Sequence, residues 1–308
     1  MMKLIKDTKQ FHINEETAVA IGKFDGVHLG HRTLLQKILE AKALGLKAAV
    51  FTFTPSPGVY FTGKTMEEIT TRKEKRAIFA KMGIDYLVEY PFDWETANLL
   101  PEAFIRHILL QNMSAHLIVA GEDVSFGRQG KGDAGLLGQL GRENGFTTKI
   151  IPKICHEGKV ISSTYARSAI KEGNMELAKA LLGEPYFLEG IVVKGNQFGR
   201  TMGMPTINLI PSKEKLLPPN GVYFSHVEYE GNVYRGVTNI GRKPTVGDEN
   251  PIGVETYLYD FSKVIYGASV RVSLLHYERA EQKFESLLKL KEAIEKNIAD
   301  GKEYFINL

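Results

Sequence analysis

Residues 22–31 read GKFDGVHLGH, with three glycines and two histidines directly after a short apolar run. That run, residues 17–21 (TAVAI), is typical of a parallel strand buried on both faces. The glycines permit tight turns and close approach of a ligand, and the N-terminus of a following helix attracts phosphate. The segment is therefore predicted to be a phosphate-binding loop at the carboxyl end of a strand, where open parallel sheets bind ligands.

His28 and His31 lie three residues apart in this loop. Across such a turn both imidazoles are able to face one point and to hydrogen-bond the phosphoryl oxygens on which charge builds when pyrophosphate is displaced. The alternative is that the histidines and glycines serve only as turn and capping residues. The other candidate phosphate-binding residues of the loop are Gly22, Phe24, Asp25, Gly26 and Gly30.

A second segment, residues 161–167 (ISSTYAR), leads into an apolar pattern of helical spacing. Ser162 or Ser163 is a candidate N-cap, and capping alone is the alternative interpretation. Arg167 lies one turn into the expected helix, where its guanidinium would clamp phosphate oxygens. Ser163, Thr164 and Arg167 are the candidate site residues of this segment.

The two halves of the 308-residue chain have different patterns. Strands alternate with helices in the first half, which predicts an open parallel sheet, and the chain is long enough for two domains. After residue 183, strand-like runs with turn signals take over, and an apolar helical stripe at about residues 283–297 closes the chain. We expect a Rossmann-like α/β domain at residues 1–184 and an antiparallel β-barrel with a terminal helix at residues 185–308.

The second half contains a glycine-rich loop, residues 195–208 (GNQFGRTMGMPTIN). Thr206 and Asn208 alternate onto one side of an extended segment, so their oxygens are suited to Mg²⁺, although a turn device is the alternative. Glu255 lies in an otherwise apolar, aromatic strand, where a semi-buried carboxylate is suited to accept a proton from an alcohol; a solvated strand face is the alternative. The candidate nucleotide-binding residues of the loop are Gly195, Gly199, Arg200, Gly203 and Pro205.

Composition restricts the classes of function. The 39 basic and 36 acidic residues give a formal charge of +3 without a dense basic block, so nucleic-acid binding is not expected. No stretch approaches the roughly 18 apolar residues of a membrane span, and no secretory signal is evident. The single cysteine, Cys155, is expected to be a small core residue in a reducing compartment. We expect a cytoplasmic protein without a membrane partner, as a monomer or weak homo-oligomer.

HxGH followed far downstream by ISSTxxR is the paired signature of the HxGH nucleotidyltransferase superfamily. Together with TFTPSP and GEDVSFGRQGKGD, the first half resembles the prokaryotic FAD synthetase module. The motifs GRTMGMPTINL, NIGRKPT, VETYLYDF and RAEQKF of the second half resemble the riboflavin kinase module. The whole chain thus resembles the bifunctional riboflavin kinase/FAD synthetase family.

The resemblance implies small-molecule substrates: ATP-dependent phosphorylation of riboflavin to FMN in the barrel, with Mg²⁺, and adenylylation of FMN to FAD in the first domain, with release of pyrophosphate. It implies that Glu255 is the kinase base, that Thr206 and Asn208 hold Mg²⁺-ATP, and that His28, His31 and Arg167 stabilise pyrophosphate. The implied flavin contacts are Ser56, Asp123, Phe126 and Arg279. Three alternatives remain: one activity only, a flavin-binding regulator, or a nucleotidyltransferase with another acceptor.

Overall fold

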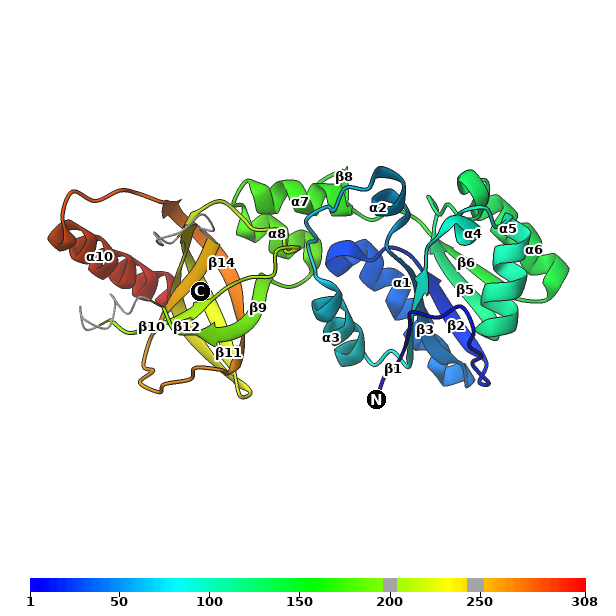
Figure 1. The fold of residues 1–308 in the computed structure, drawn as a ribbon, viewed down its shortest axis with the longest axis horizontal. Coiled ribbons are helices and arrows are strands. Elements are labelled where there is room, and N and C mark those ends of the chain that lie inside the picture. Colours follow the sequence, from blue (N-terminus) through cyan, green and yellow to red (C-terminus); the bar gives the residue numbers. More distant parts are fainter. Residues whose placement is uncertain (196–203, 243–251) are drawn as a thin grey trace. The chain divides into compact units, whose positions relative to one another are not determined.

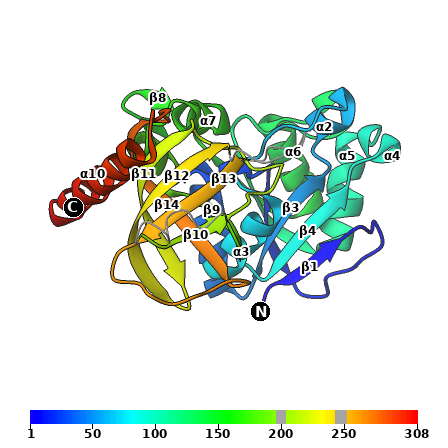
Figure 2. The ribbon, with the colours of Figure 1, turned by 60° about the vertical axis from the view of Figure 1, so that its left-hand side comes forward.

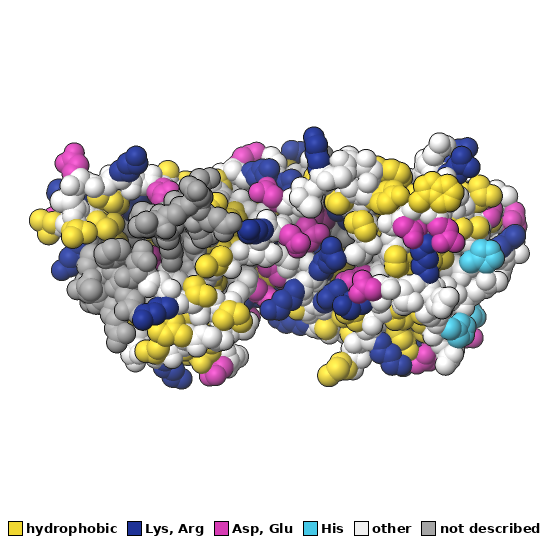
Figure 3. Space-filling view, viewed as in Figure 1, with side chains coloured by type: hydrophobic (Ala, Val, Ile, Leu, Met, Phe, Trp, Pro, Cys, Tyr) yellow, Lys and Arg dark blue, Asp and Glu magenta, His cyan; other side chains and the backbone are white. Residues whose placement is uncertain are grey.

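The computed structural model describes residues 1–195, 204–242 and 252–308. The chain divides into two compact units, Met1–Ser163 and Thr164–Leu308, which are considered separately below. In the space-filling view, basic and acidic side chains are interspersed with hydrophobic ones (Figure 3), as expected from nearly balanced numbers of the two charges. No helix in the described ranges is both long and apolar enough to cross a membrane.

The first unit is built on a parallel six-stranded sheet in the order β1-β4-β3-β2-β5-β6. Helices α1 and α3 cover one face of the sheet, and α5 and α6 cover the other (Figure 1). The strands are β1 (Lys3–Lys6), β2 (Thr17–Ile21), β3 (Lys47–Thr54), β4 (Tyr86–Pro91), β5 (Ala115–Gly121) and β6 (Thr147–Ile151). The longer helices are α1 (Leu29–Glu40), α3 (Arg72–Met82), the π-type helix η3 (Phe104–Asn112) and α6 (Ala134–Asn144).

Short elements complete the first unit. They are η1 (Asp25–Val27), η2 (Ala41–Leu44), α2 (Pro57–Thr62), α4 (Trp94–Ala97), α5 (Pro101–Ala103), η4 (Arg128–Gly130) and the hairpin of β7 (Cys155–His156) and β8 (Lys159–Val160). Cys155 is exposed on this hairpin, so its assignment to the core was wrong. A two-stranded hairpin has no second layer to bury its side chains.

The order in which strands are added to the sheet changes direction at β2. From β2 it runs through α1 to β3 and then to β4, whereas β5 lies on the opposite side of β2. Ala18, Val19 and Ala20 of β2 are fully buried, as predicted for a central parallel strand. A crevice for ligands is expected beyond the carboxyl ends of the two strands that flank such a switch point, here β2 and β5.

The second unit is a closed barrel in the order β10-β13-β12-β11-β14-β9. All six pairings of neighbouring strands are antiparallel, and Figure 2 shows β10 to β14 wrapping around the barrel. The predicted fold class is thus confirmed in both halves. The strands are β9 (Tyr186–Val193), β10 (Thr206–Leu209), β11 (Gly221–Tyr229), β12 (Asn232–Arg242), β13 (Ile252–Leu258) and β14 (Ser269–Ala280).

The terminal helix α10 (Leu287–Ile306) begins and ends later than the predicted stripe at residues 283–297. Ser286 caps its N-terminus by accepting a hydrogen bond from the Lys289 N–H at 3.2 Å. Near the other end, Phe305 packs with Phe224 and Tyr259 on the outside of the barrel. This packing extends the helix beyond the part that its spacing alone indicated, because tertiary contacts outweigh local propensity.

Helices α7 (Ser163–Lys171) and α8 (Met175–Leu182) lie between the sheet and the barrel in the sequence. The division by contacts falls at residues 163/164, not at 184/185, because α8 packs on β9 and β14. Nδ1 of His276 on β14 lies 2.6 Å from Glu176 Oε1 on α8. The functional boundary at residue 184 stays a prediction.

Candidate active sites

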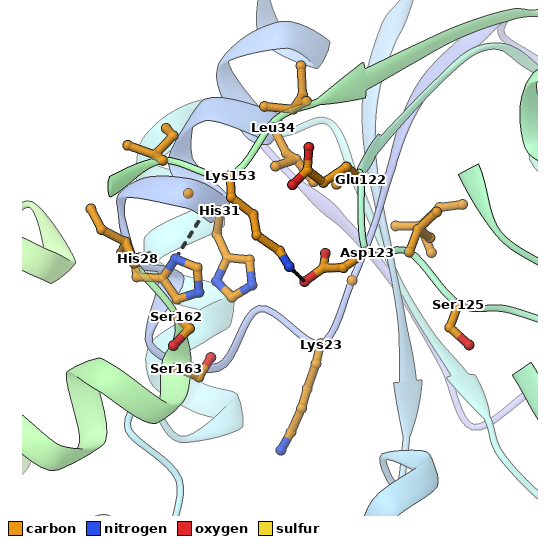
Figure 4. A pocket seen from close by; sticks show the side chains of 18 of the residues that line it. Lys23, His28, His31, Leu34, Glu122, Asp123, Ser125, Lys153, Ser162 and Ser163 are labelled. Carbon is orange, nitrogen blue, oxygen red and sulfur yellow. Dashed lines mark hydrogen bonds and ion pairs between the residues drawn. The ribbon is translucent and has the colours of Figure 1, made fainter. Parts of the chain in front are cut away.

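A cavity of about 550 Å³ opens at the carboxyl ends of β2, β3, β5 and β6 in the first unit. This is the crevice expected from the switch point between β2 and β5. Figure 4 shows His28 and His31 on one side of the cavity and Asp123 and Lys153 crossing it. The cavity is large enough for a nucleotide or a comparably sized ligand.

The loop between β2 and α1 is strained. Phe24 and Val27 have φ angles of 52° and 43°, and Gly26 has a φ of 81°. The left-handed region costs an L-residue about 1–2 kcal/mol, and a β-branched valine adopts it rarely. Phe24 and Val27 are fully buried, and the Phe24 ring packs edge-on against Phe79 at 5.7 Å. The surrounding core therefore holds a conformation that the residue types disfavour.

His28 and His31 stack, with ring centroids 3.7 Å apart and an interplanar angle of 21°. His28 is the N-cap of α1, and its Nδ1 accepts a hydrogen bond from the His31 backbone N–H at 3.4 Å. Because Nδ1 is the acceptor, the proton of the neutral His28 ring resides on Nε2. Gly30 makes this arrangement possible, since a Cβ there would lie 3.1 Å from His28 Cε1.

Both histidines are neutral at pH 7. Burial lowers the pKa of His28 to about 4, against the opposing charges of Asp25 and Asp123. Burial also holds the pKa of His31 well below 6.5, and the charges of His28 and Lys75 lower it further. Nδ1 of His31 is buried and has no hydrogen-bond partner among the described residues. The pair thus offers neutral imidazole N–H donors on the wall of the cavity.

Lys153 was not identified from the sequence, although it lies in this cavity. Its Nζ is 3.6 Å from Asp123 Oδ2, and the two side chains are 43% and 70% exposed. An ion pair with this exposure contributes about 0–1 kcal/mol to stability, so Lys153 can readily exchange Asp123 for another anionic partner. Strand β6 was not predicted, so nothing placed Lys153, two residues beyond its end, at the ligand-binding edge.

Some of the residues predicted for the adenylyl transfer site line the cavity, and others do not. Gly22, Gly30, Ser56, Asp123 and Ser163 line the cavity with the two histidines. Phe24, Asp25, Gly26 and Phe126 are buried and are not among its lining residues. Thr164 and Arg167 belong to the first turns of α7 in the second unit, and their part in this site stays a prediction.

The barrel brings Thr206, Asn208 and Glu255 together. Asn208 on β10 pairs with Glu255 on β13, and Thr206 lies two residues earlier on the same side of β10. The Thr206 hydroxyl donates a hydrogen bond to Glu255 Oε1 at 2.6 Å. The hydroxyl lone pairs and the second carboxylate oxygen are left for other partners.

Thr206, Asn208 and Glu255 supply oxygen atoms to this part of the barrel, and oxygen is the ligand atom that Mg²⁺ prefers. Asn208 is 4% exposed, and a Cβ on Gly195 would come within 2.6 Å of its amide group. The side-chain oxygens of Thr206 and Asn208 are therefore suited to act as ligands of the Mg²⁺ in a magnesium–nucleotide complex. A cavity of about 260 Å³ beside them is lined by Gly195, Pro205, Thr206, Asn208 and the loop that follows β13.

Arg279, which was predicted to contact the flavin, lies away from the 260 Å³ cavity. Arg279 on β14 donates to Asn297 Oδ1 of α10 at 3.0 Å, and its guanidinium lies 5.9 Å from the Phe284 ring centroid. It is not among the lining residues of the 260 Å³ cavity. The remaining predicted residues, Gly199, Arg200 and Gly203, lie outside the described residues.

Comparisons with known proteins identify relatives of both halves of the chain. The family described as FAD synthetase matches residues 10–165, and the riboflavin kinase family matches residues 182–305. The bifunctional riboflavin kinase/FMN adenylyltransferase of Bacillus subtilis is 38% identical over 100% of this chain and 99% of its own length. The protein of that name from Haemophilus influenzae is 36% identical over 94% of each chain.

A crystal structure from Streptococcus pneumoniae, named a macrolide-efflux protein, is also similar. It is 30% identical, covers 98% of both chains and has a TM-score of 0.86. The same two-part fold is thus carried by a protein with a different name. From the two matched families and the full-length relatives, this chain belongs to the bifunctional riboflavin kinase/FMN adenylyltransferase family.

Proposed function

We propose that this chain converts riboflavin to FAD in two ATP-dependent steps, each carried out by one of the sites described above. The barrel phosphorylates riboflavin to FMN, and the α/β unit adenylylates FMN and releases pyrophosphate. The observation that carries the proposal is that one chain holds both a stacked histidine pair at a sheet switch point and a hydroxyl–carboxylate pair on a barrel. The domain boundary proposed for these activities is residue 184.

In the kinase step, Glu255 accepts the proton of the ribityl 5′-hydroxyl as its oxygen bonds to the γ-phosphorus of ATP, and ADP leaves. The Thr206 hydroxyl occupies Glu255 Oε1, which leaves Oε2 for the substrate hydroxyl. Thr206 and Asn208 would hold Mg²⁺, which supplies charge neutralisation for the phosphates. Gly195, Gly199, Arg200, Gly203 and Pro205 would bind the nucleotide, and Arg279 the flavin.

In the adenylyl transfer step, a phosphate oxygen of FMN bonds to the α-phosphorus of ATP, and the bond from that phosphorus to the bridging oxygen of pyrophosphate breaks. His28 Nε2–H and the His31 ring donate hydrogen bonds to oxygens that gain charge. Ser163, Thr164 and Arg167 would bind the departing pyrophosphate, and Ser56, Asp123 and Phe126 are the proposed flavin-side residues. Gly22, Phe24, Asp25, Gly26 and Gly30 are proposed to shape the phosphate loop.

The test is to incubate the purified chain with riboflavin, ATP and Mg²⁺ and to separate the flavins by chromatography. FMN followed by FAD is the expected sequence of products. FMN without FAD would remove adenylyl transfer from the proposal, and FAD formed only from added FMN would remove the kinase. If turnover persists unchanged in His31→Ala and in Glu255→Ala, neither proposed site performs the chemistry; no turnover at all would favour a flavin-binding regulator.

We further propose that the enzyme acts in the cytoplasm. We also propose that it is a monomer or weak homo-oligomer, because neither activity as proposed requires a residue from a second chain. Light scattering at micromolar concentration, with and without ATP and FMN, measures the molar mass directly. A stable complex of defined size, whose dissociation abolishes either activity, would contradict this part of the proposal.

A further inference from the structure

The segment before α3 hydrogen-bonds the strained loop from outside the cavity. The Ile69 N–H donates to Asp25 Oδ1 at 2.9 Å, and the Gly26 N–H donates to Thr70 Oγ1 at 3.0 Å. Asp25 is 2% exposed and Thr70 is 4% exposed, so both bonds are shielded from water. Neither Asp25 nor Thr70 lines the cavity. The two contacts form a brace on the loop.

The brace acts where the loop is most strained. Gly26 lies between Phe24 and Val27, which both have left-handed backbone conformations, and two residues before His28. Such conformations persist only where surrounding interactions enforce them. Without Thr70 Oγ1, the buried Gly26 N–H would have no acceptor from this segment, and a buried unpaired donor favours rearrangement. The direction of the His28 ring therefore depends on Thr70.

The brace is itself anchored to a rigid element. Thr71 is the N-cap of α3 and forms a capping box with Glu74, whose Oε2 accepts a hydrogen bond from the Thr71 N–H at 2.8 Å. Phe79, two turns further along α3, packs against the Phe24 ring. The segment before α3 and the helix itself thus hold the loop at two points, one polar and one aromatic.

We propose that Thr70 is a positioning residue for adenylyl transfer: through the Gly26 N–H it holds the strained loop in the conformation that aims His28 into the cavity, without touching substrate. This inference rests on the proposed function of the cavity. It gives segment 69–70 a part in this step that none of the sequence motifs indicated.

The first test compares Thr70→Val with Thr70→Ser in the full chain. Valine keeps the shape but removes the acceptor, so we expect kcat for FAD formation from FMN to fall about tenfold or more, since loss of positioning costs up to about 100-fold per ångström. Serine keeps the oxygen and should retain kcat within about threefold of the unmodified chain. Riboflavin phosphorylation should be unchanged in both variants, which shows that the barrel is folded, and an unchanged far-UV circular dichroism spectrum shows that the first unit is folded as well.

The matched control is Thr17→Val. Thr17 is fully buried in the same unit, and its hydroxyl donates to the Met113 carbonyl at 2.7 Å, at the opposite end of β2 from the loop. It should lose thermal stability without losing kcat for FAD formation. Equal loss of kcat in Thr17→Val and Thr70→Val, or no rescue by Thr70→Ser, would overturn the proposal.

A spectroscopic readout separates this inference from the proposed function. In NMR titrations, with the His28 signals assigned by comparison with His28→Gln, the His28 pKa should rise in Thr70→Val because the ring leaves its buried position. It should stay near its original value in Thr70→Ser. If the chain forms no FAD, the proposed function fails, but the titration still tests the brace. An unchanged His28 pKa in a folded Thr70→Val would refute it.

Discussion

Gly30→Ala places a methyl group against the His28 ring. The new Cβ would lie 3.1 Å from His28 Cε1 and 3.2 Å from Nδ1, so the ring must move by a few tenths of an ångström. That movement also disturbs the 3.4 Å hydrogen bond from the His31 N–H to His28 Nδ1. Gly30 lies in the first turn of α1, where alanine raises helix propensity by up to about 1 kcal/mol. Activity and stability are therefore expected to change in different directions.

The magnitude follows from the displacement. Since a misplacement of about 1 Å costs about 100-fold in rate, a shift of about 0.3–0.5 Å corresponds to a loss of about four- to tenfold in kcat for FAD formation. The assay measures kcat for FMN adenylylation, the rate of riboflavin phosphorylation and the melting temperature of one preparation. Phosphorylation should be unaffected, and the melting temperature should be unchanged or raised.

Gly138→Ala is the matched control. Gly138 lies in α6, and a Cβ there would meet its nearest neighbours, Arg142 Nη1 and Thr148 Oγ1, at 3.9 and 4.0 Å, which are ordinary contacts. This variant should keep full adenylyl transfer. The reasoning is refuted if Gly30→Ala retains its kcat, or if both alanine variants lose the same activity.

Three further predictions address the other groups. The pKa of His28 is about 4 in the folded chain and about 6.5 in the unfolded chain. The free energy of unfolding should therefore be highest above pH 6.5 and fall by up to about 3 kcal/mol as the pH drops to 4, because the unfolded state binds the proton more tightly. Urea unfolding followed by the fluorescence of Trp94, the single tryptophan, should show this loss in the unmodified chain and a smaller one in His28→Gln. Glu255→Gln should lower riboflavin phosphorylation about 100-fold and leave FAD formation from added FMN intact; equal loss of both rates would indicate misfolding. Lys153→Met should raise KM for ATP in FAD formation about three- to tenfold, because the Lys153 ammonium is expected to exchange Asp123 for an ATP phosphate. Lys149→Met, at an exposed position of β6, should leave this KM unchanged. Equal effects would mean that Lys153 acts only as a general surface charge.

The sequence predicted the strands and helices that carry the sites better than the backbone conformation of the loops between them. Residues 17–21 were predicted as a strand and match β2 residue for residue, because an apolar run bounded by glycine is a strong local signal. The positive φ angles of Phe24 and Val27 had no such signal, since neither residue type favours them. The conformation comes from contacts with Thr70 and Phe79, which are distant in sequence.

In the barrel site, the sequence indicated the candidate residues but not the contact between them. The alternation of Thr206 and Asn208 was evident from their spacing, and Glu255 was notable as a carboxylate in an aromatic strand. The hydrogen bond between Thr206 and Glu255 depends on the pairing of β10 with β13, in which Asn208 faces Glu255. A shift of one residue would turn these side chains to opposite faces, and no local pattern determines the register of strands so far apart.

The low pKa of His28 links the stability of the first unit to its chemistry. The burial that lowers this pKa to about 4 also keeps the His28 ring neutral at the place proposed for the charge that develops during adenylyl transfer. A neutral N–H donor fixed in such a site stabilises that charge more strongly than the same donor in water, and it needs no reorganisation during the reaction. This arrangement has two costs for stability. The folded state is less stable in acid, and Phe24 and Val27 of the loop have left-handed backbone conformations. The contacts that Thr70 and Phe79 make with the loop offset the backbone cost, so substitutions that relax this loop should raise the pKa of His28 and lower the rate of FAD formation together.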